Sequence, residues 1–195
     1  MNSLLQKGKL LEYATLGWNI IGIVVLITAV RGIHSIALIG FGFDTLLEIG
    51  ASIVVIWELN ETEKKRQKIG LQLLSIAFFA LGVYILIQSI LNLIYHTLPG
   101  QSLLGIAWLL LTIIVMIILA LKKFQVGKLL NNPVLLTEGR VTLVDATLAF
   151  LVLLSMLFTA LFGWWWIDSI GGFILMVYCF WEAIHIYKDL RIKDD

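Results

Sequence analysis

Three carboxylates lie deep inside long apolar stretches of this sequence, where charge is costly. Asp44 and Glu48 lie in one stretch and Asp145 in another, and no Lys or Arg in those stretches lies at a matching depth. A central acidic residue costs about 2.5–3.5 kcal/mol on membrane-insertion scales, so three cost on the order of 8–10 kcal/mol. Residues of this kind are functional by default and face a cavity or a partner rather than lipid.

The spacing of these carboxylates indicates what they do. Asp44 and Glu48 are four residues apart, so on a helix they share one face about one turn apart. Counted at about 1.5 Å per residue, Asp145 reaches a similar depth from its own stretch. Converging carboxylates repel one another unless they are protonated or bound to a cation. The pattern predicts a site where a divalent metal ion and protons compete. Protonated carboxyls that hydrogen-bond between helices as packing remain the alternative.

Four weaker candidates surround this set. Glu12 and Glu138 begin the first and fifth apolar stretches. Each is expected either to cap a helix N-terminus, where negative charge is favourable, or to be an entrance ligand for the cation. Asn19 and Thr142 lie one turn from possible site positions, and we expect them to hydrogen-bond to the ligands.

The elements that must position these residues are membrane-spanning helices. The chain has 195 residues, is 60% hydrophobic and 14% charged, and has a mean hydropathy of +0.98. Soluble proteins are about 45–50% apolar and about 25% charged. A span needs roughly 20 apolar residues and must be helical to satisfy its backbone. The prediction is an all-α integral membrane protein with a single transmembrane domain over residues 1–195. Its six helices are expected over residues 13–30, 35–57, 69–95, 103–121, 141–162 and 165–187.

Basic residues predict the orientation. With the N-terminus inside, every Lys and Arg except Arg31 falls in the segments on the cytoplasmic side. Cytoplasmic segments carry such an excess, so both termini are predicted to be cytoplasmic in a multi-pass protein of the cell membrane. On this interpretation Lys123 belongs to a loop between the fourth and fifth spans. Glu58 belongs to a solvated loop between the second and third spans, and Glu182 is interfacial. Short turns are expected at Arg31-Gly32, Pro99-Gly100, Asn131-Asn132-Pro133 and Gly163.

The sequence also suggests an internal repeat. Asp44 precedes Trp57 by thirteen residues, and Asp168 precedes Trp181 by thirteen residues. A Glu follows each Trp. The first two and last two spans are therefore predicted to be equivalent hairpins. The two hairpins are not chemically equal, because the sixth span has Gly172 at the position that corresponds to Glu48 of the second span.

The run Phe43-Asp44-Thr45-Leu46-Leu47-Glu48-Ile49-Gly50-Ala51-Ser52 resembles the second helix of cation diffusion facilitator transporters. That helix has an acidic-xxx-acidic pair followed by small residues. The region from Asp145 through Trp166-Ile167-Asp168 resembles their fifth and sixth helices. The resemblance implies a homodimer in the lipid bilayer that exports a divalent metal ion, typically zinc, in exchange for protons. It implies that Asp44, Glu48 and Asp145 are the metal ligands, and that there is no prosthetic group and no enzymatic activity.

The sequence departs from that family in two ways. The family usually has His or Asp four residues before the fifth-helix Asp, where this chain has Val141. The fourth ligand is then expected from Thr142, Glu138, water or another helix. Such an all-oxygen set leaves manganese, iron or magnesium open beside zinc. The family also usually has a cytoplasmic domain after the sixth helix, whereas this chain continues only about eight residues past that span. Dimerisation is then expected through membrane surfaces.

Other classes of function remain open from the sequence. One is a non-transporting scaffold or sensor, and another is a transporter of organic cations or of protons alone. An intramembrane aspartyl protease is weaker, because Gly40-Phe41-Gly42-Phe43-Asp44 is one residue too long for the Gly-x-Gly-Asp element of such enzymes. A net charge of +1 gives no basic field for nucleic acid. The single cysteine, Cys179, excludes an internal disulfide and a Cys-rich metal site.

Overall fold

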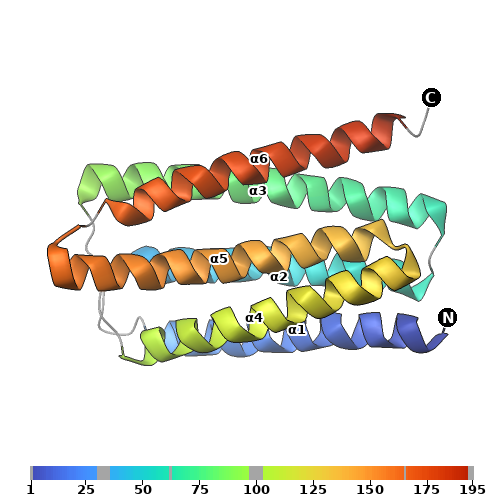
Figure 1. The fold of residues 1–195 in the computed structure, drawn as a ribbon, viewed down its shortest axis with the longest axis horizontal. Helices are drawn as coiled ribbons and strands as arrows, with labels where there is room; N and C mark the ends of the chain where they lie inside the picture. The colour runs from blue at the N-terminus through green and yellow to red at the C-terminus, as the bar shows by residue number, and fades with distance from the viewer. Residues whose placement is uncertain (1, 30–35, 62, 97–102, 165, 193–195) are drawn as a thin grey trace.

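The computed structural model describes residues 2–29, 36–61, 63–96, 103–164 and 166–192. Within these ranges the chain is helical and contains no strand. The helices lie along one long axis, and both ends of the chain lie at the same end of the bundle (Figure 1). Their bounds are α1 Asn2–Ala29, α2 Ile36–Asn60, α3 Lys64–Tyr95, α4 Leu103–Leu130, α5 Pro133–Phe162 and α6 Ile167–Ile192.

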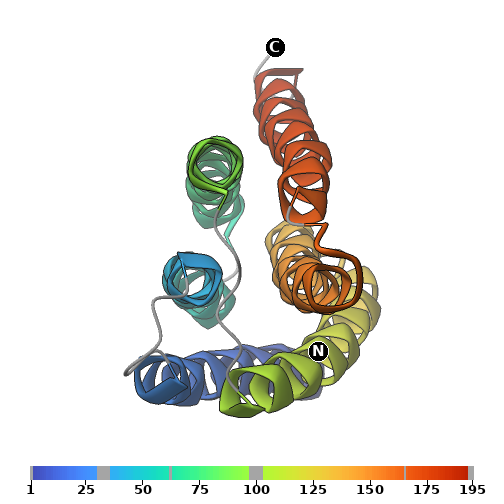
Figure 2. The same cartoon turned by 90° about the vertical axis from the view of Figure 1, so that its left-hand side faces the viewer.

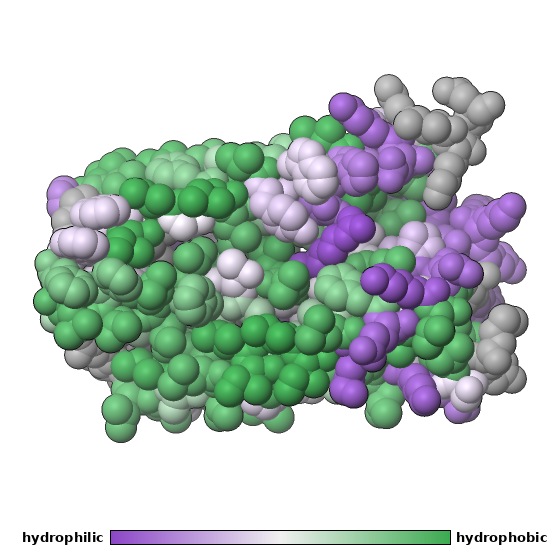
Figure 3. Space-filling model, viewed as in Figure 1, coloured by the Kyte–Doolittle hydropathy of each residue, from purple (hydrophilic) through white to green (hydrophobic). Residues whose placement is uncertain are grey.

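The outer surface is that of a membrane protein. In the part of the chain that the structure describes, five helices, α1, α3, α4, α5 and α6, contain a stretch long and apolar enough to cross a bilayer, and α2 completes the bundle. Apolar side chains cover most of the face in Figure 3, and hydrophilic residues gather at the end that carries both termini. We call this end the polar end. The prediction of an all-α transmembrane bundle is confirmed.

Several helices are longer than their predicted spans. The helix α1 begins at Asn2, α4 continues to Leu130, and α5 begins at Pro133. The basic residues around Lys123 and Arg140 are therefore helical, and the predicted loop is reduced to a short turn. Hydropathy locates the hydrocarbon-length part of a helix, whereas helical hydrogen bonding continues beyond it.

Two of the predicted turns are confirmed. The Asn132 side chain accepts a hydrogen bond from the Leu135 amide at 2.9 Å, with Pro133 in the first turn of α5. This is the favoured chemistry of a helix N-terminus. At the other end Gly163 closes α5 with φ of 71°, a left-handed conformation that glycine adopts readily. The turns expected at Arg31-Gly32 and Pro99-Gly100 lie outside the described residues.

Four helices form the ring that holds the candidate site. The helices α1, α2, α5 and α4 each contact the next, and α4 returns to α1 (Figure 2). Trp18 of α1 stacks on Trp108 of α4 with ring centroids 4.6 Å apart, and its indole nitrogen donates to Thr112 at 3.2 Å. These contacts join α1 to α4, which α2 and α3 separate in the sequence.

The other two helices, α3 and α6, pack closely on one another beside α2 and α5. Small residues allow this approach, as is common between membrane helices. A Cβ atom on Gly172 would lie 2.2 Å from the Ser89 Oγ atom. The two predicted hairpins therefore differ in packing, because α6 packs mainly on α3 while α2 packs on α1.

Candidate functional site

The three deep carboxylates are all buried inside the helical bundle. Asp44 and Glu48 come from α2 and Asp145 from α5, and each is at most 2% exposed. Asp145 lies close enough to interact with both of the α2 carboxyls. The structure thus brings together the set that the spacing singled out.

Most oxygens of this set accept no hydrogen bond from a residue outside the set. They are both carboxyl oxygens of Asp145, Oδ2 of Asp44 and Oε1 of Glu48. A buried polar atom left unsatisfied costs about 1–3 kcal/mol, and more when it is charged. As the side chains stand, no three His, Cys, Asp or Glu residues in the described ranges are arranged to hold a metal ion. The free oxygens are nevertheless buried on carboxyls that interact with one another, where a cation or protons would satisfy them.

Asn19 of α1 contacts this set directly. Its Nδ2 donates to Glu48 Oε2 at 3.0 Å, and both side chains are buried. The hydrogen bond is of the kind expected from the sequence. It fixes one oxygen of Glu48, whereas the other, Oε1, accepts no hydrogen bond from a neighbouring donor.

A second buried cluster lies nearer the polar end, centred on Lys123 of α4. Its ammonium contacts both oxygens of Glu138 at 2.7 and 2.6 Å, Oε2 of Glu12 at 3.3 Å and the Thr142 hydroxyl at 2.9 Å. The hydroxyls of Thr142 and Ser52 donate to Glu138 Oε1 at 3.2 and 3.3 Å. All five side chains are completely buried. We call these five residues the lysine cluster.

The lysine cluster corrects three predictions. Glu12 lies well inside α1 and Glu138 in the second turn of α5, whose cap is Asn132, so neither is an N-terminal cap. Lys123 is not a loop residue. Its burial follows the helical periodicity of the buried face that the structure gives α4. The buried face of α4 recurs at helical spacing through and beyond it, at Thr112, Met116, Leu119, Lys123 and Val126.

The two clusters form one series of buried charges. Glu48 lies within electrostatic range of both Lys123 and Glu138, and Asp145 within range of Lys123. Along the helices the series runs from Asp44, farthest from the polar end, to the lysine cluster. A continuous polar line inside an apolar ring is what a cation path through a membrane requires.

Two further acidic residues are held by α5. Glu58, predicted to be solvated, lies in α2 and is fully buried, and the Asn132 amide donates to both its oxygens at 3.0 and 2.8 Å. Glu182 of α6, predicted to be interfacial, is 1% exposed and forms an ion pair with the partly exposed Arg140. The prediction for Glu58 was wrong, because the Asn132 amide holds its carboxyl inside the protein, whereas the interfacial position of Glu182 stays a prediction.

Replacing Asn132 with Ala is expected to destabilise the protein by about 2–3 kcal/mol. The change removes a helix cap, worth about 0.5–2 kcal/mol, and takes from the buried Glu58 carboxyl the hydrogen bonds that Asn132 donates, at about 1–3 kcal/mol. The measurement is thermal unfolding in detergent. Asn131→Gly is the control and should be nearly neutral, because its φ of 50° suits glycine. Equal melting temperatures for both variants would contradict this account.

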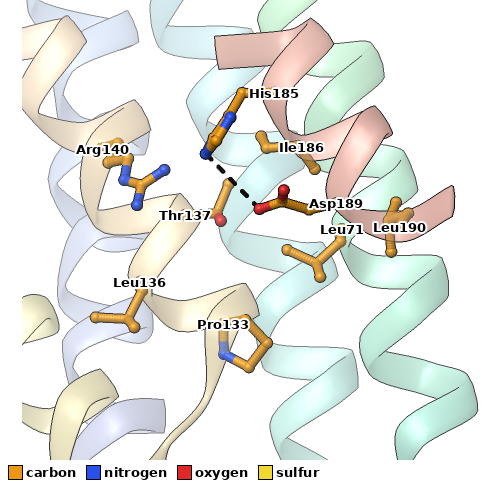
Figure 4. A pocket seen from close by; sticks show the side chains of 9 residues that line it. All are labelled: Leu71, Pro133, Leu136, Thr137, Arg140, His185, Ile186, Asp189 and Leu190. Atoms are coloured by element: carbon orange, nitrogen blue, oxygen red, sulfur yellow. Dashed lines mark ion pairs between the residues drawn. The ribbon is translucent and has the colours of Figure 1, made fainter. Parts of the chain in front are cut away.

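A pocket near the polar end lies apart from these clusters (Figure 4). It has a volume of about 130 Å³ between α3, α5 and α6 and contains His185, whose Nε2 lies 3.7 Å from Asp189 Oδ2. None of the predicted site residues lines it. The candidate cation site is therefore the interior of the helical ring rather than this surface pocket.

Comparison with known proteins agrees with the geometry. Residues 14–191 match the cation efflux transmembrane domain. The chain is also similar to transmembrane protein 163 of Xenopus laevis, with 27% identity over 154 residues. That similarity covers 74% of this chain and 55% of the frog protein, so the chain spans about half the length of this curated relative. Asp44, Glu48 and Asp145 thus lie within the matched cation efflux transmembrane domain, and the chain belongs to the cation efflux family.

Proposed function

We propose that this protein exports a divalent metal ion in exchange for protons, with Asp44, Glu48 and Asp145 as the ligands of the transported ion. The observation that carries the proposal is a set of buried carboxyls that interact with one another and whose oxygens mostly accept no hydrogen bond from any other residue. Membership of a cation efflux family supports the class of substrate. A cation bound to these oxygens offsets their mutual repulsion, and protons do the same after it leaves.

The proposed route begins at the polar end, which the distribution of basic residues assigns to the cytoplasm. A cation enters past Glu12 and Glu138, binds at the deep carboxylates, and leaves toward the opposite side when the ring opens there. Protonation then neutralises the emptied site. The protein alternates between these states, as secondary transporters with central sites do.

The fourth ligand is not Val141, whose side chain is apolar and buried. Thr142 and Glu138 are both engaged by Lys123. The amide oxygen of Asn19 is the better candidate, because its nitrogen is already fixed by Glu48. An oxygen-rich set suits manganese, iron or magnesium as well as zinc. We expect the working unit to be a homodimer in the bilayer.

The proposal predicts metal flux by the purified protein alone. Vesicles containing the full chain should take up at least one of zinc, manganese or iron faster than protein-free vesicles. Asp44→Asn should reduce that uptake by about tenfold or more, because it removes one negative charge from a buried cation site. A pH-sensitive dye should report protons that move in the direction opposite to the metal ion. Metal binding without flux would instead indicate a sensor, and wild-type flux in Asp44→Asn would reject the assigned site.

A further inference from the structure

The Lys123 side chain ends in the position that a bound cation would take. Its ammonium is surrounded by four oxygens from two carboxylates and one hydroxyl, at 2.6 to 3.3 Å. Glu12 comes from α1, and Glu138 and Thr142 come from α5. The lysine ammonium is a compact point charge, so among side chains it most resembles a metal cation.

We propose that Glu12, Glu138 and Thr142 form a second cation site, which Lys123 occupies as a tethered internal cation. The proposal rests on the proposed function, because it assigns this site to the cytoplasmic approach of the transported ion. While the ammonium is in place the site is closed to metal. When it withdraws, a divalent ion from the cytoplasmic side can bind the same oxygens.

The charge of the cluster supports this assignment. With both carboxylates ionised, one ammonium leaves the cluster with a net negative charge, which a divalent ion in its place would cancel. Glu12 is completely buried, yet neither of its oxygens accepts a hydrogen bond. Carboxylate–metal distances of about 2.0–2.6 Å are shorter than the 3.3 Å from Glu12 to Lys123. A metal ion would therefore draw Glu12 inward and replace its long ion pair with Lys123 by a direct bond.

The location gives the tethered cation a role in transport. Lys123 lies between the polar end and the deep carboxylates and is within electrostatic range of Glu48 and Asp145. An ion that passes from the polar end to the deep site must meet this positive charge. Lys123 is thus a positioning residue that holds α1, α4 and α5 together at the cytoplasmic end until the ion displaces it.

The test is the number of metal ions bound by the purified full chain in detergent, measured by elemental analysis after equilibration with zinc or manganese. Lys123→Met should bind one more equivalent than wild type. The double variant Lys123→Met with Glu138→Gln should lose that extra equivalent. Lys122→Met is the matched control, because the neighbouring lysine is exposed, and it should bind the wild-type number. Lys123→Arg keeps the charge and should also bind the wild-type number.

If Lys123→Met unfolds too readily for the metal content to be measured, its thermal unfolding with and without metal provides the test. Without metal this variant should melt below wild type, because two buried carboxylates have lost their cation. Added metal should raise its melting temperature more than it raises that of wild type or Lys122→Met. An unchanged number of bound ions, together with no added metal stabilisation, would overturn the second site. Failure of the proposed transport would appear separately, as absent flux in wild-type vesicles.

Discussion

Asp145→Asn is expected to abolish metal transport while the helical bundle stays folded. Asparagine has nearly the shape of aspartate but removes the charge that faces both α2 carboxyls. Loss of one partner from a buried charge interaction costs about 3–5 kcal/mol, which corresponds to a loss of affinity of more than about 100-fold. Flux into vesicles at a fixed metal concentration should therefore fall to the protein-free rate.

The matched control for this change is Asp189→Asn on α6. Its carboxyl is 57% exposed and lies near His185, away from the ring, so the same chemical substitution should leave flux unchanged. Measuring both flux and melting temperature also distinguishes a role of the deep carboxyls in transport from a role in packing alone. If the carboxyls served only as hydrogen-bonded packing, Asp145→Asn would alter the melting temperature and leave the flux near that of wild type.

Gly172→Leu is expected to have the largest effect on stability. A Cβ atom at this position would lie 2.2 Å from Ser89 Oγ and 3.5 Å from Ile85 Cγ2, and leucine adds three more carbons. The helices α3 and α6 would have to separate along their closest contact. Overpacking of a close interface costs about 1–3 kcal/mol, occasionally more, and we expect the upper part of that range.

The measurement is thermal unfolding in detergent, with Gly17→Leu of α1 as the control. No atom lies within 4 Å of a Cβ at Gly17, so the same substitution there should be tolerated. A melting temperature for Gly172→Leu equal to that of Gly17→Leu would show that α3 and α6 are not held at this contact.

Much of the fold was predictable from the sequence, because a bilayer limits what a chain can do. An apolar stretch of about twenty residues must be helical where no water can satisfy its backbone. Pro133 after two Asn residues and Gly163 before the Trp run marked helix ends through local conformational preferences, and both were confirmed. The deep carboxylates were also visible, because the cost of an acidic residue in hydrocarbon does not depend on which helices are neighbours.

The sequence by itself determined the helices and the three carboxylates that lie deepest in them. Only the tertiary structure decided which charges beyond the apolar stretches are buried. Lys122 and Lys123 are adjacent and alike in the sequence, yet one is exposed and the other fully buried. The physical reason is that helices continue past the hydrocarbon. A side chain there meets water or a neighbouring carboxylate according to how α1, α4 and α5 are rotated, and that rotation is set by packing between helices.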